Sequence, residues 1–277
     1  MTVISLKSAQ VREGLALPYA EAGYPSGTPV VFVHGLADSW WSFEPLLRRL
    51  PASLHGYAPT QRGHGDAGRP PEGYTPDDFA ADLVDFLNVV DIPRAVLVGA
   101  SSGGVPARIV AGSHPDRIAG LVLLGVPGTL ADKPAVASMA RAMEDLADPV
   151  PRAFVEDFLA DTMTRPIARG FVETMVEENL KLPAYVWKDT ARGLLDADLR
   201  ATLAGILVPT LVIWGEQDEF LPREDQQTIL DAVHGAEFLA YPETGHCLQW
   251  EQPERVVADI AAFVTRIEHP GTRAGGR

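Results

Sequence analysis

The sequence of 277 residues has little that would tie it to an extracellular or membrane setting. It contains a single cysteine, Cys247, so an intramolecular disulfide is excluded. No apolar run approaches the roughly 18 residues that a membrane-spanning helix needs. The first residues also lack the basic stretch followed by an apolar stretch that is typical of a secretory signal peptide. These absences predict a cytoplasmic protein that has no membrane partner.

Positive charge is also scarce. The chain has 23 Lys and Arg residues against 37 Asp and Glu residues, a formal net charge of −14 at pH 7. Such an acidic surface repels phosphate backbones and anionic lipid headgroups, so nucleic acid is not expected as a partner. The sequence likewise predicts no cofactor and no metal site. It leaves the oligomeric state open.

What the sequence does contain is an alternation of short apolar runs and amphipathic stretches. The runs at 30–33, 95–98, 121–124 and 211–214 are rich in Val, Ile and Leu and show no polar alternation, as is typical of strands buried on both faces of a parallel sheet. Apolar residues at helical spacing follow in 75–90 and 256–267. This pattern predicts an α/β fold with a mostly parallel central sheet flanked by helices.

One segment breaks the alternation. Residues 129–204 carry methionines and aromatic residues at helical spacing, with prolines between the groups and no run that resembles a strand. We expect a helical cap over a core formed by residues 1–128 and 205–270. The tail, 271–277, is expected to be flexible because it is short, polar and rich in glycine.

A pair of adjacent serines follows the apolar run at 95–98, in the stretch VLVGASSGG. Ser101 is the centre of a G-x-S-x-G pattern, in which a strand turns sharply into a helix and exposes the serine. Gly99 and Gly103 supply the small positions that such a tight turn needs. Centring the pattern on Ser102 puts an alanine at one of these positions and fits less well. We therefore predict Ser101 as the catalytic nucleophile.

A serine hydroxyl needs a base, and the chain supplies one in the right order. His246 is the candidate general base, since imidazole titrates near neutral pH. Asp218 follows the run at 211–214 and is the candidate that orients His246. Glu216 and Glu219 are the weaker alternatives. The order of Ser101, Asp218 and His246 along the chain is that of an α/β-hydrolase triad.

Two further sets of residues follow from the same reasoning. The backbone N–H groups of Leu36 and Ser102 are predicted to form an oxyanion hole, because each follows a tight turn beside the nucleophile. His34 lies in the turn after the run at 30–33 and is expected to have a structural role. Large apolar side chains beside that turn or in the cap are predicted to bind substrate: Trp40, Trp41, Met143, Phe158 and Trp187.

Several stretches together resemble one known superfamily. They are VVFVHGLADSW, RGHGDAGRP, LVGASSGG, HPDRIAGLVLL, PTLVIWGEQDEFLP and ETGHCLQWEQPERV. From about residue 18 to residue 267 the chain resembles enzymes of the α/β-hydrolase fold, of the serine esterase and lactonase type. Relatives with an aspartate nucleophile, such as haloalkane dehalogenases and epoxide hydrolases, are disfavoured because Ser101 holds that position.

The sequence thus predicts a serine hydrolase that cleaves a small-molecule carboxylic ester or lactone through an acyl-enzyme. A C–C bond hydrolase or a perhydrolase would use the same three residues. A ligand receptor of this fold that turns over slowly is the alternative from a different class.

Overall fold

The computed structural model describes residues 2–130 and 133–270, so the predicted flexible tail, 271–277, lies outside the described residues. In this part of the chain the strands form one sheet in the order β1-β2-β4-β3-β5-β6-β7-β8. Their bounds are β1 (Ile4–Arg12), β2 (Leu15–Gly23), β3 (Thr28–Val33), β4 (Leu54–Pro59), β5 (Ala95–Ala100), β6 (Ile118–Leu124), β7 (Thr210–Gly215) and β8 (Glu237–Tyr241).

The sheet is mostly parallel. Strands β4, β3, β5, β6, β7 and β8 pair in parallel, whereas β2 is antiparallel to both β1 and β4. The four apolar runs lie in β3, β5, β6 and β7, where nearly every residue is buried. The predicted α/β fold with a mostly parallel central sheet is therefore confirmed.

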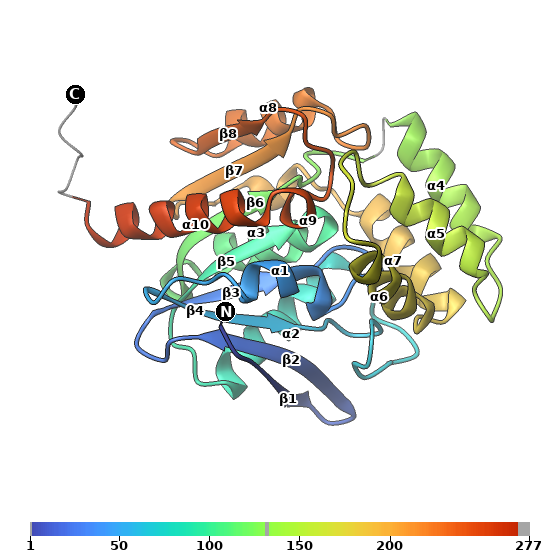
Figure 1. Ribbon diagram of the computed structural model, residues 1–277, viewed down its shortest axis with the longest axis horizontal. Helices are drawn as coiled ribbons and strands as arrows, with labels where there is room; N and C mark the ends of the chain where they lie inside the picture. Colours follow the sequence, from blue (N-terminus) through green and yellow to red (C-terminus); the bar gives the residue numbers. More distant parts are fainter. Residues whose placement is uncertain (1, 131–132, 271–277) are drawn as a thin grey trace.

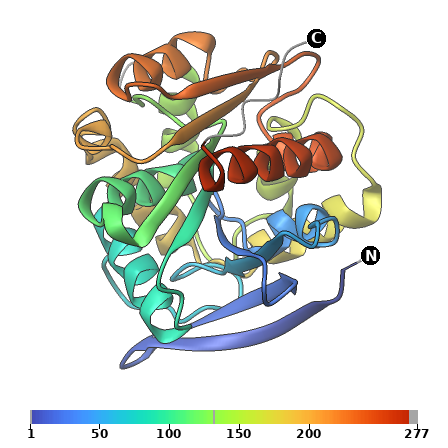
Figure 2. The same ribbon diagram turned by 90° about the vertical axis from the view of Figure 1, so that its left-hand side faces the viewer.

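Helices cover both faces of the sheet (Figure 2). They are α1 (Glu44–Leu47), α2 (Pro76–Val89), α3 (Gly104–Ser113), α8 (Arg223–Ala232), α9 (Leu248–Glu251) and α10 (Pro253–Glu268). Side chains that alternate along β3 pack into opposite layers: Val31 and Val33 face the α2 and α3 side, and Val30 and Phe32 face the α1 and α10 side. A strand with both faces buried has no polar positions, which is why these runs are uniformly apolar.

The segment predicted as a helical cap contains α4 (Pro134–Glu144), α5 (Arg152–Ala160), α6 (Arg169–Leu180) and α7 (Ala184–Asp196). Figure 1 shows these four helices gathered together on one side of the sheet. Their apolar faces pack on one another and on residues of the core, Phe79 and Trp250 among them.

Buried polar contacts hold both ends of this segment to the core. Arg108, on α3, donates to the carbonyl oxygens of Pro127 and Leu199 and to Thr202 Oγ1, at 2.6, 2.8 and 2.6 Å. Asp225, on α8, accepts from the backbone N–H of Gly128 at 3.0 Å. The chain therefore leaves and re-enters the core at neighbouring, fixed points.

Candidate active site

Ser101 stands at the turn between β5 and α3. Its backbone φ is +50°, a left-handed conformation that non-glycine residues rarely adopt and that costs on the order of 1–3 kcal/mol. A Cβ atom added to Gly99 would lie 2.4 Å from Gly104 Cα, and one added to Gly103 would lie 2.1 Å from the carbonyl oxygen of His34. Larger residues would therefore push the turn apart, which is the physical reason for glycine at these two positions.

The structure brings His246 and Asp218 next to this serine. His246 Nε2 lies 2.9 Å from Ser101 Oγ, and His246 Nδ1 lies 2.7 Å from Asp218 Oδ2. The three residues come from the loops that follow β5, β7 and β8. Parallel strands place their carboxyl ends at one edge of the sheet, so residues far apart in the sequence meet there.

Asp218 differs from its acidic neighbours in burial and in hydrogen bonding. It is 5% exposed, while Glu216 and Glu219 are exposed to solvent. Its second oxygen, Oδ1, accepts the backbone N–H groups of Phe220 and Leu221, both at 3.0 Å. These two bonds fix the carboxyl group so that Oδ2 faces the imidazole.

The electrostatics favour a histidine that can accept a proton. Burial lowers the pKa of His246, but the charge of Asp218 and the hydrogen bond to it outweigh burial, so the pKa is raised above its ordinary value. With the Nδ1 proton donated to Asp218, Nε2 is left to accept the proton of the Ser101 hydroxyl. This is the arrangement that general-base chemistry at a serine requires.

Leu36 and Ser102, whose backbone N–H groups were predicted to form an oxyanion hole, lie beside Ser101. Both residues line the cavity that contains Ser101. A Cβ atom added to Gly35 would lie 3.2 Å from Ser101 Cβ, so the turn after β3 passes directly against the serine. The Leu36 N–H donates to no other backbone group in the described part of the chain, so this amide is available to a ligand.

His34 holds loops together rather than facing the reaction. Its Nδ1 lies 2.8 Å from the carbonyl oxygen of Gly35, and its Nε2 accepts the backbone N–H of Gln61 at 2.9 Å. Burial and the nearby imidazole of His64 lower its pKa well below the ordinary value. A neutral His34 thus ties the turn after β3 to the loop after β4.

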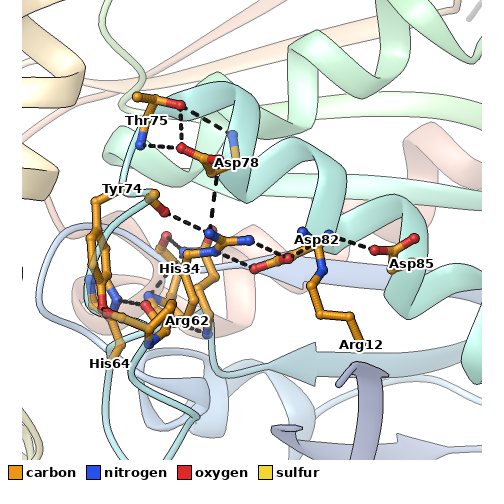
Figure 3. Close-up of polar contacts among 12 residues, drawn as sticks. Arg12, His34, Arg62, His64, Tyr74, Thr75, Asp78, Asp82 and Asp85 are labelled. Carbon is orange, nitrogen blue, oxygen red and sulfur yellow. Dashed lines mark hydrogen bonds and ion pairs between the residues drawn. The ribbon is translucent and has the colours of Figure 1, made fainter. Parts of the chain in front are cut away.

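That second loop is anchored in turn by a buried ion pair (Figure 3). Arg62 donates Nε and Nη2 to the two carboxylate oxygens of Asp82 on α2, at 2.5 and 2.6 Å, and donates Nη1 to the carbonyl oxygen of Gly73 at 2.7 Å. Planar pairing of this kind fixes geometry as well as adding energy. The support of the turn after β3 therefore extends through the loop after β4 into α2.

A cavity with an empty volume of about 930 Å³ opens above Ser101 and His246. This volume includes space that is open to solvent, so the cavity is accessible from outside. Most of its wall is apolar and comes from the helical segment and the loops that flank it, including Leu130, Val136, Met139, Phe158, Leu159, Ala191, Leu194 and Phe220.

Of the five predicted substrate-binding residues, the structure places only Phe158 in the wall of this cavity. Met143 and Trp187 are fully buried inside the helical segment, where Trp187 packs edge-on against Phe158 at 5.2 Å. Trp40 and Trp41 stack on each other at 4.4 Å and do not reach the cavity. The wall of this cavity therefore does not include these four predicted substrate-binding side chains, and Trp187 packs behind Phe158.

Several side chains that line the cavity were not among the predicted substrate-binding residues. Met139 lies one turn before Met143 on α4, and Gln249 follows His246 closely in the sequence. Asp38, also in the wall, is 7% exposed. Its position two residues after Leu36 was the available signal. Cys247 lines the cavity as well, and burial raises the pKa of its thiol.

No cluster of three or more His, Cys, Asp or Glu side chains that could hold a metal ion occurs within residues 2–130 and 133–270. Within the same ranges, no helix has the length and apolar character needed to cross a membrane.

Comparison with known proteins agrees with this geometry. The profile of the family described as alpha/beta hydrolase fold matches residues 28–253, which is most of the chain. The chain therefore belongs to the alpha/beta hydrolase fold family.

Individual relatives have different activities. The chain is 28% identical to 2-hydroxymuconate semialdehyde hydrolase of Pseudomonas sp. (strain CF600), over 88% of this chain and 89% of that enzyme. It is 26% identical to 3-oxoadipate enol-lactonase 2 of Acinetobacter baylyi, over 96% of this chain and 100% of that enzyme. The crystal structure of an esterase from Exiguobacterium antarcticum has a TM-score of 0.84 at 21% identity, covering 94% of this chain and 99% of that chain. Esterases, lactonases and C–C bond hydrolases thus all occur among the relatives and structural neighbours of this chain.

Proposed function

We propose that this protein is a serine hydrolase that cleaves a carboxylic ester or lactone through a Ser101–His246–Asp218 triad. The observation that carries the proposal is the continuous hydrogen-bonded chain from Asp218 through His246 to Ser101 Oγ, with distances of 2.7 and 2.9 Å. This chain ends in a cavity whose wall is mostly apolar.

In the first half of the reaction, Ser101 Oγ attacks the carbonyl carbon of the substrate, and its proton passes to His246 Nε2. The carbonyl oxygen becomes an oxyanion that accepts hydrogen bonds from the N–H groups of Leu36 and Ser102. When the intermediate collapses, the ester C–O bond breaks and His246 gives the proton to the leaving oxygen. The acyl group stays on Ser101.

In the second half, a water molecule attacks the acyl-enzyme while His246 takes one of its protons. The bond from the acyl carbon to Ser101 Oγ then breaks, and His246 returns the proton to Ser101. Asp218 keeps its charge throughout and stabilises the imidazolium that forms twice in the cycle.

The cavity favours a neutral, largely apolar substrate. Among the described residues that line it there is no Lys or Arg side chain, so a substrate carboxylate would find no cationic partner. We further propose that residues 129–204 act as a cap that determines which substrates fit, because α4, α5 and α7 contribute Met139, Phe158 and Leu194 to the wall.

C–C bond hydrolysis is the second candidate, since a relative with 28% identity is a 2-hydroxymuconate semialdehyde hydrolase. The same triad could cleave a bond between a carbonyl carbon and an adjacent carbon. The lack of Lys and Arg in the described part of the wall makes an acidic dicarbonyl substrate the poorer fit.

The activity can be tested on the purified protein with p-nitrophenyl esters of increasing chain length, a panel of neutral lactones and a set of vinylogous diketones. We expect turnover of neutral esters or lactones at rates that exceed those of the diketones. Turnover of diketones alone, with esters and lactones left intact, would show that the chain is a C–C bond hydrolase.

Two methionines on α4 provide a matched pair for testing the cap. Met139 faces the cavity, whereas Met143, one helical turn later, is fully buried behind it. We expect Met139→Ala to change the ratio of kcat/KM between long-chain and short-chain esters by about 10- to 200-fold. This corresponds to about 1–3 kcal/mol, because one wall contact is lost.

Met143→Ala serves as the control and is expected to lower the free energy of unfolding by about 2–5 kcal/mol while keeping the parent's chain-length profile. The measurements are kcat/KM over the ester series and urea unfolding of each variant. Equal changes in the profile of both variants would contradict a direct role for Met139.

A further inference from the structure

Asp38 is an acidic side chain in the wall of an otherwise apolar cavity. It lies two residues after Leu36 and is 7% exposed. Among the described residues that line the cavity it is the only Asp or Glu, since Asp218 lies behind His246. The triad does not use it. Burying a carboxyl group is costly unless the group has hydrogen-bond partners, so its place in this wall calls for an explanation.

One oxygen of Asp38 has a partner whose orientation is fixed. Ser42 Oγ lies 2.9 Å from Asp38 Oδ2. The same Ser42 oxygen accepts the indole N–H of Trp250 at 3.1 Å and the amide of Gln249 at 3.3 Å. Because both of these groups are donors, the hydroxyl proton of Ser42 is left to point at Asp38. The carboxyl group is therefore held in one position at the cavity wall.

Asp38 keeps spare accepting capacity beyond this bond. A carboxylate offers about four acceptor positions, of which the Ser42 hydroxyl and the Asn179 amide take two. Burial raises the pKa of Asp38 to about 7, against the opposing effects of the Ser42 hydroxyl, the nearby His246 and the Asn179 amide. The titratable neighbours that respond to its charge are His246 and Cys247, which the charge of Asp38 shifts to higher pKa.

We propose that Asp38 is a specificity-determining residue that accepts a hydrogen bond from a hydroxyl group of the substrate. This inference rests on the proposed ester or lactone hydrolysis and narrows its substrate class to hydroxylated, otherwise apolar molecules. A hydroxyl suits this position in either protonation state, because a neutral carboxyl group still has a carbonyl oxygen that accepts. A site built to bind a hydroxyl discriminates strongly against an analogue that lacks it, since the buried polar group is then left unpaired.

Two other roles for Asp38 would change the kinetics of its variants in different ways. If Asp38 acted only through His246, its loss would lower kcat for all esters by the same factor and leave the preference for a hydroxylated ester unchanged. If it only supported the loop between Leu36 and Ser42, its loss would reduce the fraction of folded enzyme and leave the preference among substrates unchanged.

The test uses ester pairs of equal chain length: butyl butanoate against its 2-, 3- and 4-hydroxybutyl analogues, and against butyl 3-hydroxybutanoate. Wild-type enzyme, Asp38→Asn and Asp38→Leu are compared by kcat/KM, with active sites counted by fluorophosphonate titration so that unfolded protein does not enter the rates. We expect the wild type to prefer at least one hydroxylated ester by about 10- to 100-fold, the size of one hydrogen bond to a charged group. Asp38→Leu should abolish this preference, and Asp38→Asn, which keeps an accepting oxygen, should retain part of it.

Absence of any preference in the wild type would overturn the inference and would not need a folded variant. An equal loss of kcat on all esters in the Asp38 variants, with the preference for a hydroxylated ester retained, would also overturn it in favour of a role through His246. Failure of the proposed function gives a distinct result: no ester of either kind is cleaved, and Ser101 is not labelled by the fluorophosphonate.

Discussion

Replacing Ser101 with alanine is expected to lower kcat for any ester or lactone substrate by about 10⁶-fold, because no other group can form the acyl bond. The His246 base and the oxyanion amides would remain, so a small residual rate above that of water is expected. The measurement is kcat on the best ester of the panel, with peptide mapping of the fluorophosphonate adduct. We expect that adduct on Ser101.

Ser102→Ala is the matched control one residue away. This change keeps the backbone N–H that is proposed to bind the oxyanion, so kcat should stay within a few-fold of the parent value. An adduct on Ser102, or a greater loss of activity in this variant than in Ser101→Ala, would reverse the assignment of the nucleophile.

The second large effect is expected from Asp218→Asn, which should lower kcat by about 10⁴-fold. In this structure the reason is geometric. Asp218 Oδ1 is held by the N–H groups of Phe220 and Leu221, so the asparagine oxygen would keep these two bonds. Its NH₂ group would then face His246 Nδ1 and force the proton onto Nε2. In that tautomer His246 cannot accept the proton of Ser101.

The pH dependence of kcat should also change in the Asp218→Asn variant. Asp218 raises the pKa of His246, and catalysis needs the neutral imidazole. Activity of the parent should therefore fall as the pH drops through a value above the ordinary histidine pKa of about 6.5. In Asp218→Asn this fall in activity on the acid side should move to lower pH.

Glu216→Gln is the control, because Glu216 is an exposed acid two residues before Asp218. It should alter neither kcat nor the pH at which activity falls. A severe loss in Glu216→Gln with a mild one in Asp218→Asn would identify the other carboxylate.

The parts of the site that could be predicted from the sequence are those fixed by backbone geometry. The turn at Ser101 requires glycine at positions 99 and 103, because added Cβ atoms would overlap the chain. Asp218 could be preferred over Glu216 because side chains alternate in direction along an extended strand end, so Glu216 was expected to point to the other side. Local rules of this kind survive folding because the steric limits that cause them are local.

Which side chains line the cavity could not be predicted from local sequence patterns. Met139 and Met143 share an apolar helix face, and the same periodicity holds for a side chain that faces a cavity and for one buried between helices. Which of the two reaches the substrate depends on how α4 packs against α5 and α7. Trp40 and Trp41 do not line the cavity for a similar reason: their nearness in the sequence to the turn after β3 does not determine the direction in which a short helix points them.

The sequence by itself determined the α/β fold, the family resemblance and the chain order of the candidate nucleophile, acid and base, because these depend on hydrophobic runs and on tight turns that few residues allow. The tertiary structure alone decided the shape of the cavity and the burial of Asp38. The position of that carboxyl group depends on Ser42, whose hydroxyl is oriented by Gln249 and Trp250, more than 200 residues further along the chain. Contacts between residues so distant in the sequence are set by packing of whole layers, and no pattern within either segment specifies them.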